Sequence, residues 1–362
     1  MYPSFNHEKK VRVILVDDSL VALAMFKKIL ADAPSIEVVG VASNGQDGLL
    51  LVERFHPQVI CTDYHMPIMD GLEFTRQVMA RFPTPILALS ISFQPDQTHK
   101  IFKMLEAGAV DVMAKPLAGI NKFGCDESKE LVRKIMILAG VHVIPLRKFT
   151  HISPPVVEAL RQEPTIYPYS TSIIAMGAST GGPQAIFEIL KKIPADFPVP
   201  IVCVQHISEG FIDGMIAWLN HLCSVCVCAA KEGETPQAGH VYFPRDGQHL
   251  TLDRKGAFAY ENLPPVSGHK PSISVTFSSL RDYYHQGVTG VLLTGMGRDG
   301  VDGLRDIFAA GGMTIAQNQM SSVVFGMPKV AIEEGVVRLV LSIETIGERL
   351  IALVKGEHVA SS

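Results

Sequence analysis

Three aspartates, a serine and a lysine stand where apolar, strand-like runs end in the first part of the chain. They are Asp17, Asp18, Asp63, Ser90 and Lys115. Carboxylates gathered at one sheet edge repel one another unless a cation joins them, and their hard oxygen atoms suit magnesium. An aspartate beside a divalent ion and an ammonium group can attack a phosphoryl donor, because both cations balance the developing charge. One strand-end aspartate alone would favour a helix cap, but the five residues together predict a phosphoryl-accepting magnesium site.

A second set of reactive side chains is built around Ser179, in the Gly-Ala-Ser-Thr-Gly segment 177–181. The segment fits the G-x-S-x-G pattern, in which a tight strand-to-helix turn exposes a serine hydroxyl. Backbone N–H groups at the start of the following helix can stabilise an oxyanion. Such a turn can also bind a phosphate. However, the segment around Ser179 has neither the Gly-Lys-Ser/Thr of a P-loop nor the G-x-G-x-x-G spacing of a dinucleotide site.

A serine nucleophile needs a base and an acid that orients the base. His206 follows the apolar strand-like run 201–205, and Asp299 lies in a glycine-rich turn after the run 288–294. Taken singly, His206 suits a hydrogen-bonded loop histidine, and Asp299 suits a helix N-cap. Three strand ends that supply a nucleophile, a base and an acid together favour a serine hydrolase with Ser179, His206 and Asp299 in those roles.

The elements that position the first set alternate between strands and helices. The predicted strands are 11–16, 36–42, 58–62, 86–90 and 110–114, and the predicted helices are 22–33, 45–55, 71–81, 99–107 and 126–139. This alternation predicts a doubly wound, flavodoxin-like parallel sheet, whose functional residues lie beyond the carboxyl ends of its strands. A second α/β pattern opens with the strand 172–176 and predicts a second, mainly parallel sheet.

The segment between the two patterns contains five prolines within residues 142–171 and little periodicity. This composition is typical of a partly stiff linker. We therefore expect a first domain over residues 1–140, a linker over 141–171 and a catalytic domain over 172–362. A length of 362 residues suits two domains.

Composition narrows the class of protein. With 47% hydrophobic and 19% charged residues, both domains can bury a core. A net charge of −4 argues against a nucleic-acid-binding output. The sequence has no apolar run of about 18 residues or more and no signal-peptide pattern, so we expect no membrane insertion and a cytoplasmic location.

The cysteines raise one alternative, a zinc site. Cys223, Cys226 and Cys228 follow His221 closely, but no second ligand pair stands at zinc-finger spacing. We interpret residues 225–229 as a buried strand, in which the thiols are small core side chains.

Over about residues 10–140 the chain resembles the response-regulator receiver family. The residues that carry the resemblance are Asp17-Asp18, Asp63 within 63–71, Ser90, and Lys115-Pro116. The resemblance implies that Asp63 is the phosphoacceptor, that Asp17, Asp18 and the backbone carbonyl of His65 bind magnesium, and that Ser90 and Lys115 bind the phosphoryl group. It also implies a histidine kinase as phosphoryl donor.

Two positions depart from the receiver pattern. Ile91 stands where receivers usually carry a smaller residue, which would narrow access to Asp63. Val112 stands where an aromatic switch residue is common, so the signalling surface is expected to respond differently.

The second part of the chain resembles the methylesterase domain of the chemotaxis protein-glutamate methylesterases, the CheB family. The matching stretches are Gly177–Pro183, Gln205-His206, His269–Ser272, Leu293–Gly300 and Val323–Pro328. The resemblance implies Ser179 as nucleophile, His206 as base and Asp299 as its orienter, with Thr180 and Met296 beside the reacting carbonyl. It implies hydrolysis of glutamate methyl esters, and deamidation of glutamines, on chemoreceptors, with no cofactor for the hydrolysis.

The order of receiver, linker and esterase implies a regulated enzyme. In the unphosphorylated state the receiver is expected to cover part of the catalytic cleft, and phosphorylation of Asp63 to move it away. A non-catalytic adaptor is the main alternative, which the intact Ser179, His206 and Asp299 disfavour. A DNA-binding output is disfavoured by the absence of a basic helical stripe.

Two positions also depart from the esterase pattern. Ser274 stands where the family usually has an aspartate, and Gln317-Asn318-Gln319 replaces a segment that commonly carries acidic residues. We expect neither to touch the three catalytic residues.

Overall fold

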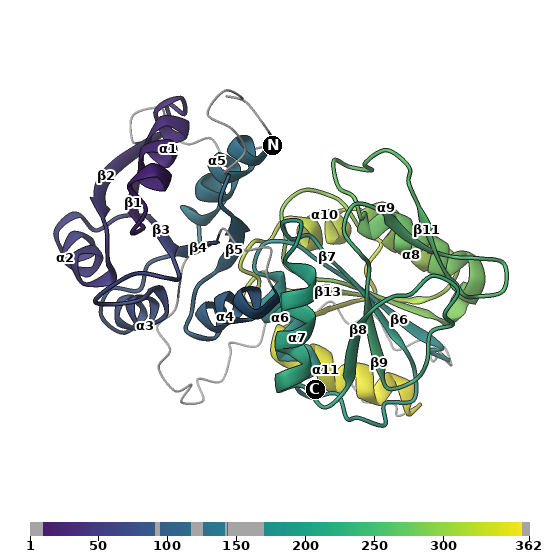
Figure 1. The fold of residues 1–362 in the computed structure, drawn as a ribbon. Coiled ribbons are helices and arrows are strands. Elements are labelled where there is room, and N and C mark those ends of the chain that lie inside the picture. The colour runs from purple at the N-terminus through teal and green to yellow at the C-terminus, as the bar shows by residue number, and fades with distance from the viewer. Residues whose placement is uncertain (1–9, 91–94, 117–125, 142, 144–169, 357–362) are drawn as a thin grey trace.

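The computed structural model describes residues 10–90, 95–116, 126–141, 143 and 170–356. They form two α/β units that lie side by side, each a parallel sheet with helices on both faces (Figure 1). The predicted linker 141–171 lies almost wholly outside the described residues. None of the described helices is long and apolar enough to cross a membrane.

The first unit is a five-stranded parallel sheet in the order β2-β1-β3-β4-β5. Its strands are β1 Val11–Val16, β2 Ile36–Ala42, β3 Val59–Asp63, β4 Ile86–Ser90 and β5 Asp111–Ala114. Its helices are α1 Leu20–Ala31, α2 Gly45–Phe55, α3 Gly71–Arg81, α4 Pro95–Glu106 and α5 Asp126–Leu138. The strand order reverses between β1 and β3, which is the flavodoxin-like arrangement, so the predicted fold class is confirmed.

Local capping sets where the first helices begin. The side chain of Ser19 accepts a hydrogen bond from the N–H of Ala22, so α1 starts two residues before its predicted start. Asn44 and Asp70 cap α2 and α3 in the same way. Each cap follows the carboxyl end of a strand closely, so the loops at that edge are short and hold their polar residues near the sheet.

The second unit is a seven-stranded sheet in the order β14-β13-β12-β6-β7-β9-β8, and every pairing is parallel. Its strands are β6 Ile173–Ala178, β7 Ile201–Gln205, β8 Cys226–Ala229, β9 His240–Phe243, β12 Val288–Leu292, β13 Met313–Gln317 and β14 Leu339–Leu341. A separate antiparallel hairpin joins β10 His249–Leu252 and β11 Phe258–Glu261. The strand order reverses between β6 and β12, where α/β sheets usually bind their ligands.

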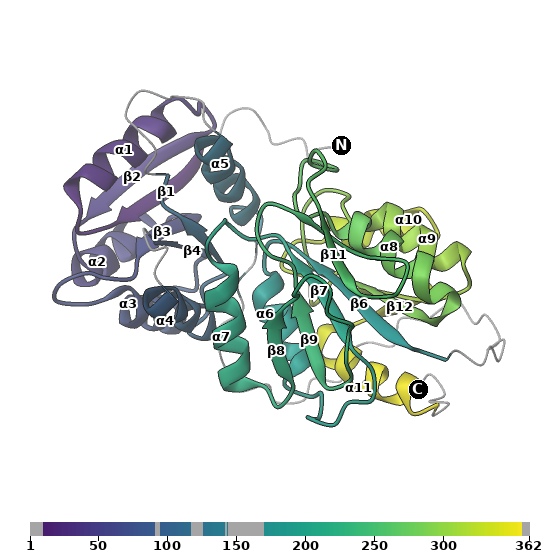
Figure 2. The same ribbon diagram turned by 45° about the vertical axis from the view of Figure 1, so that its right-hand side comes forward.

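Helices cover both faces of this sheet (Figure 2). One face is covered by α6 Gly182–Leu190, α7 Ile212–Leu222 and α11 Ile343–Val354. The other is covered by α8 Ile273–Tyr284, α9 Val301–Ala309 and α10 Met327–Glu333, with a short 3₁₀ turn at His285–Gly287. Side chains of β6 alternate between the two cores, Ile174 and Met176 on the first face and Ile173 and Ala175 on the second. A strand buried on both faces reads as a continuous apolar run, which is why it was predictable.

The prediction that residues 225–229 form a buried strand is wrong in part. Strand β8 exists, but it is the edge of the sheet, and Cys226 is exposed there. Alternating apolar residues do not distinguish an edge strand from a central one, because only the tertiary pairing decides it. Among the described residues no group of three metal-ligating side chains includes Cys223, Cys226 or Cys228.

The two units meet through α4 of the first and α7 of the second, which lie side by side in both views (Figures 1 and 2). The indole ring of Trp218 stacks on Phe102 with 5.5 Å between ring centroids. Its Nε1–H donates a hydrogen bond to Glu106 Oε1 at 2.7 Å. Near the carboxyl end of β5, the N–H of Ala114 donates to Ser208 Oγ at 3.3 Å. This second contact joins the β5 edge of the first sheet to the loop that follows β7.

Candidate active site and phosphoacceptor site

Ser179 occupies the turn between β6 and α6, at the point where the strand order reverses. Its N–H donates to the carbonyl of Thr294 at 3.0 Å, and its own carbonyl accepts from the N–H of Gly182 at 2.8 Å. The left-handed backbone of this turn falls on Gly181, with φ 76°, and not on the serine. The turn is therefore different from the strained serine elbow that the G-x-S-x-G pattern describes in α/β-hydrolases.

His206 leaves the end of β7, the strand next to β6. Its backbone N–H donates to the carbonyl of Ala178, the residue before Ser179, at 2.9 Å. The amide Nε2 of Gln205 donates to the carbonyls of both Ser179 and His206, at 2.8 and 2.7 Å. These bonds fix the backbone of the serine against that of the histidine. Sequence reasoning did not assign this role to Gln205.

The imidazole of His206 is oriented by Asp299. Its Nε2 lies 2.9 Å from Asp299 Oδ2. Because a carboxylate can only accept, Nε2 carries the proton in this bond, and in the neutral imidazole the lone pair is then on Nδ1. Nδ1 is buried and has no hydrogen-bond partner among the described residues. An imidazole held by an acid at one nitrogen, with the other nitrogen unprotonated, is equipped to accept a proton.

Asp299 is almost fully buried, with 1% of its surface exposed, and its carboxylate accepts five hydrogen bonds. The donors are His206 Nε2, Ser272 Oγ and the N–H groups of Ile273, Ser274 and Gly300. Burial alone would raise the pKa of Asp299, but the bonds from His206, Ser272 and Ile273 outweigh burial and hold the pKa far below its ordinary value. Asp299 is therefore ionised throughout the neutral range.

In this region the structure excludes one alternative for Asp299 and corrects one expectation about Ser274. Asp299 is not the N-cap of α9, because Gly300 occupies that position with φ 90°. Ser274 was expected not to touch the candidate catalytic residues but contacts one of them, Asp299: its N–H donates to Asp299 Oδ1 at 3.2 Å, and its Oγ accepts from the N–H of Gly300 at 2.8 Å. The start of α8 packs directly under the Asp299 turn, and sequence spacing gives no sign of that contact.

Thr180 and Met296 both lie close to Ser179. Thr180 is buried, and its Oγ1 has no hydrogen-bond partner among the described residues. Met296 follows Gly295, whose Cα faces Ser179 so closely that an added Cβ would stand 2.7 Å from the Cβ of the serine. The turn after β6, which carries Thr180, and the turn after β12, which carries Met296, therefore meet at Ser179. The Gln317 side chain supports the second turn by accepting from the N–H of Thr294 at 2.8 Å.

The acidic site of the first unit lies at the carboxyl ends of β1 and β3. Carboxylate oxygens of Asp17, Asp18 and Asp63 all lie within 4.8 Å of one another. Lys115 Nζ lies 2.6 Å from Asp17 Oδ2 and 3.2 Å from Asp63 Oδ1. Burial raises the pKa of Asp63, the Lys115 ammonium opposes the rise, and Asp17 adds to it. Lys115 thus pairs with two of the three carboxylates, and a divalent cation fits this donor set in both charge and chemistry.

The other residues that the sequence singled out in the first unit are Ser90, Val112, His65 and Ile91. Ser90 is buried at the end of β4, and its carbonyl accepts from the N–H of Lys115 at 2.8 Å. Val112 is fully buried in β5, on the face covered by α2, α3 and α4. His65 lies in the loop that follows β3, and the ligand role of its carbonyl stays a prediction. Ile91 lies outside the described residues.

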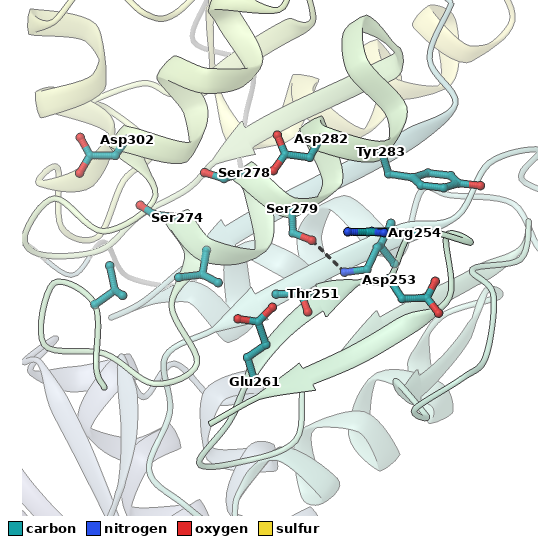
Figure 3. Close-up of a pocket in the computed structure, with 13 residues that line it drawn as sticks. Thr251, Asp253, Arg254, Glu261, Ser274, Ser278, Ser279, Asp282, Tyr283 and Asp302 are labelled. Carbon is teal, nitrogen blue, oxygen red and sulfur yellow. Dashed lines mark hydrogen bonds between the residues drawn. The ribbon is translucent and has the colours of Figure 1, made fainter. Parts of the chain in front are cut away.

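A cavity of about 720 Å³ lies between α8 and the β10–β11 hairpin (Figure 3). The residues that line it include Arg254, Glu261, Asp282 and Ser274. Ser279 Oγ accepts from the N–H of Leu252 at its floor. Of the residues that bind Asp299 only Ser274 lines it, and Ser179 and His206 do not. This cavity therefore adjoins the candidate active site and is not part of it.

The fold and the two sites define a response regulator whose output domain is a hydrolase. Residues 13–121 match the response regulator receiver domain, and residues 174–350 match the CheB methylesterase. A solved structure, the Thermotoga maritima CheB methylesterase catalytic domain, is similar with a TM-score of 0.50 and 36% identity, covering 51% of this chain and 99% of that one.

Two relatives match nearly the whole chain. One is a protein-glutamate methylesterase/protein-glutamine glutaminase of Syntrophus aciditrophicus, 38% identical over 95% of this chain and 98% of that protein. The other, of the same description, comes from Methanospirillum hungatei and is 39% identical over 89% of this chain and 92% of that protein. The chain therefore belongs to the CheB methylesterase family.

The low pKa of Asp299 predicts a stability effect that depends on pH. Because the folded pKa lies below the unfolded one, ionised Asp299 stabilises the fold above the ordinary carboxyl range, at about pH 4, and this contribution is lost as pH falls. Asp299→Asn should therefore lower stability near neutral pH by about 1–3 kcal/mol. Thermal unfolding of both proteins should show the difference shrinking toward about pH 3. A difference that stays constant over this range would contradict the assignment.

Proposed function

We propose that this chain hydrolyses γ-methyl esters of glutamate side chains on chemoreceptors, deamidates glutamines there, and is activated by phosphorylation of its receiver. The observation that carries the proposal is the arrangement around Ser179: its turn is bonded to the backbone of His206, and His206 is bonded to the buried Asp299. The relatives of the same domain order are described as protein-glutamate methylesterase/protein-glutamine glutaminase.

In the proposed acylation step, His206 Nδ1 accepts the hydroxyl proton of Ser179 as Oγ attacks the ester carbonyl. The C=O bond becomes a C–O⁻ single bond, and the resulting intermediate collapses with cleavage of the bond to the methoxy group. That group leaves as methanol with the proton from His206. A glutamine side chain would lose ammonia instead.

Water completes the reaction. His206 Nδ1 takes a proton from the water as its oxygen attacks the acyl-serine, and the bond to Ser179 Oγ breaks. The proton returns to Ser179, and the glutamate carboxylate is released. Asp299 stays ionised throughout, and its role is to hold the Nε2–H tautomer and stabilise the imidazolium.

Oxyanion stabilisation is assigned to the turn that follows Ser179. The dipole of α6 adds partial positive charge at this turn. Thr180 and Met296 would line the reacting carbonyl. The buried, unpartnered Oγ1 of Thr180 supports this placement, because a substrate atom could satisfy it.

Phosphorylation is assigned to Asp63, with a histidine kinase as the donor. Magnesium, held by Asp17, Asp18, Asp63 and the carbonyl of His65, would neutralise charge on the transferred phosphoryl group. Lys115 would bind the same group from the opposite side of the carboxylate, and Ser90 would donate its hydroxyl. The shared contact of Lys115 with Asp17 and Asp63 supports this assignment.

Regulation is assigned to the way the receiver sits beside the esterase. Val323 packs against the receiver core formed with α1 and α5, and the same side chain closes on Gly181 beside Ser179. The charges of Glu130 and Arg133 on α5 act on His269 next to His206. While α5 remains next to Val323 and His269, a receptor helix could not approach Ser179 and His206.

The link between the two sites is short. Lys115 follows Ala114, whose N–H bonds to Ser208 Oγ two residues after His206. A phosphoryl group on Asp63 would draw Lys115 and Ser90 toward it and shift the carboxyl end of β5. This movement would strain the Ala114–Ser208 bond and favour release of the receiver.

Loss of the nucleophile is the first test. Ser179→Ala should lower methanol release from methylated receptor membranes by about 10⁴-fold or more, because no acyl-enzyme can form. Ser224→Ala, an exposed serine between α7 and β8, is the matched control and should retain full activity. Normal hydrolysis by the Ser179→Ala enzyme would rule out the proposed nucleophile.

The phosphoacceptor is tested separately. A small phosphoryl donor with Mg²⁺ should accelerate ester hydrolysis by the wild-type protein, and Asp63→Asn should lose that acceleration. Chelation of Mg²⁺ should abolish it as well, because the carboxylate cluster then lacks its cation. Asp32→Asn, at the exposed end of α1, should respond like the wild type. An undiminished response in the Asp63→Asn protein would refute the assignment.

The interface predicts a variant that is active without phosphorylation. Glu106→Ala removes the acceptor for the Trp218 Nε1–H, which costs the docked arrangement about 1–3 kcal/mol. The basal hydrolysis rate, measured without any phosphoryl donor, should rise about 5-fold or more. Glu53→Ala, on the exposed side of α2, should leave it unchanged. If the basal rate of the folded Glu106→Ala protein does not rise, the α4–α7 contact does not restrain the enzyme.

A further inference from the structure

A second imidazole lies against the first. The ring of His269 stacks on the ring of His206, with 3.8 Å between centroids and only 8° between planes. This is closer than the other stacked ring pairs of the described residues, Phe102–Trp218 at 5.5 Å and His240–Tyr242 at 5.8 Å. His269 contributes no hydrogen bond to Ser179 or Asp299 that would account for its position.

The backbone of His269 is fixed by a tight turn. Its N–H and carbonyl exchange hydrogen bonds with those of Val266, at 3.0 and 3.1 Å. The two residues between them, Ser267 and Gly268, both have left-handed backbones, with φ 52° and 81°. A two-residue turn with positive φ at both positions leaves little freedom to the residue that closes it.

The segment that contains this turn is tied down at both ends by one buried histidine. His249, on β10, is fully buried. Its Nε2–H donates to the carbonyl of Pro264 at 3.1 Å, and its Nδ1 accepts from the N–H of Ser272 at 3.2 Å. Residues 264–272 are therefore held as a rigid strap over the end of β7, and His269 is the side chain that the strap places on His206.

The same segment also orients the acid. Ser272 and the two residues after it supply three of the five hydrogen bonds to Asp299. One continuous stretch, residues 269–274, thus contacts the flat face of His206 and the carboxylate that bonds to its edge. The bond to Asp299 restrains rotation of the His206 ring within its own plane. The stacked ring of His269 restrains tilting of the His206 ring out of that plane.

We propose that His269 is a positioning residue for the esterase reaction, which keeps the imidazole of His206 at the angle that presents Nδ1 to Ser179. The inference rests on the proposed role of His206 as the base. It assigns no proton transfer to His269, whose ring lies over the face of His206 and not at either ring nitrogen.

The charge state of His269 suits this role. Burial and the positive charge that His206 can carry lower the pKa of His269 to about 4, with Asp299 opposing and Arg133 and Glu130 contributing smaller effects of opposite sign. His269 is therefore uncharged near neutral pH. It adds no repulsion when His206 takes the serine proton, and its π face can stabilise the imidazolium.

The test compares three side chains at position 269 in the full-length protein. His269→Ala removes the ring and should lower kcat for ester hydrolysis by about 10- to 100-fold, with little change in KM. His269→Phe keeps a flat ring without nitrogen atoms and should recover most of kcat. His240→Ala, which removes a stacked histidine from the opposite edge of the sheet, is the control and should retain wild-type kcat.

A spectroscopic readout separates positioning from general damage. In protein labelled with ¹⁵N-histidine, His206 should show one Nε2–H tautomer in the wild type and in His269→Phe, and a mixture of tautomers in His269→Ala. Wild-type kcat in His269→Ala would overturn the inference. Failure of His269→Phe to recover kcat would also overturn it, because the imidazole nitrogens would then be required.

The proposed function and this inference fail in different ways. If His206→Ala retains full activity, the assignment of the base is wrong and His269 has nothing to position. If His206→Ala is inactive and His269→Ala is fully active, only the role of His269 is wrong.

Discussion

The active site depends on the burial of one negative charge. Asp299 has 1% of its surface exposed, and an isolated carboxylate at such a position would be strongly destabilising. It is tolerated because five donors surround it, from the end of β7, the start of α8 and the start of α9. The donors come from three separate segments of the chain. Their bonds to one carboxylate therefore fix how these segments are arranged around it. The orientation of His206 follows from that arrangement.

The two sheets use their carboxyl edges for different purposes. In the first, Asp17 and Asp63 share the single ammonium group of Lys115, and the net negative charge that remains suits a divalent cation, which would in turn attract a phosphoryl group. In the second, hydrogen bonds satisfy the charge of Asp299, which in the proposed mechanism orients the base His206. Both sites lie where the strand order of their sheet reverses. The side chains and backbone groups around each site then determine its chemistry.

Much of the fold and of the candidate active site could be predicted from the sequence. The central strands are buried on both faces, so β1, β4 and β7 stand out as apolar runs with the predicted bounds. Strand ends in a parallel sheet share one edge, and this rule alone brought Ser179, His206 and Asp299 together. The stack of His269 on His206 and the contact of Ser274 with Asp299 could not be predicted, because residues 269–274 reach the site through the fold of the β10–β11 hairpin and α8. The edge position of β8 was likewise set by tertiary pairing.

The most direct test of the account is covalent capture of the nucleophile by a serine-directed fluorophosphonate, followed by peptide mass spectrometry of the full-length protein. The account predicts one adduct, on Ser179, that forms faster when a phosphoryl donor and Mg²⁺ are present and is lost in His206→Ala. An adduct on another residue, or a labelling rate at Ser179 that neither the donor nor His206→Ala changes, would contradict it.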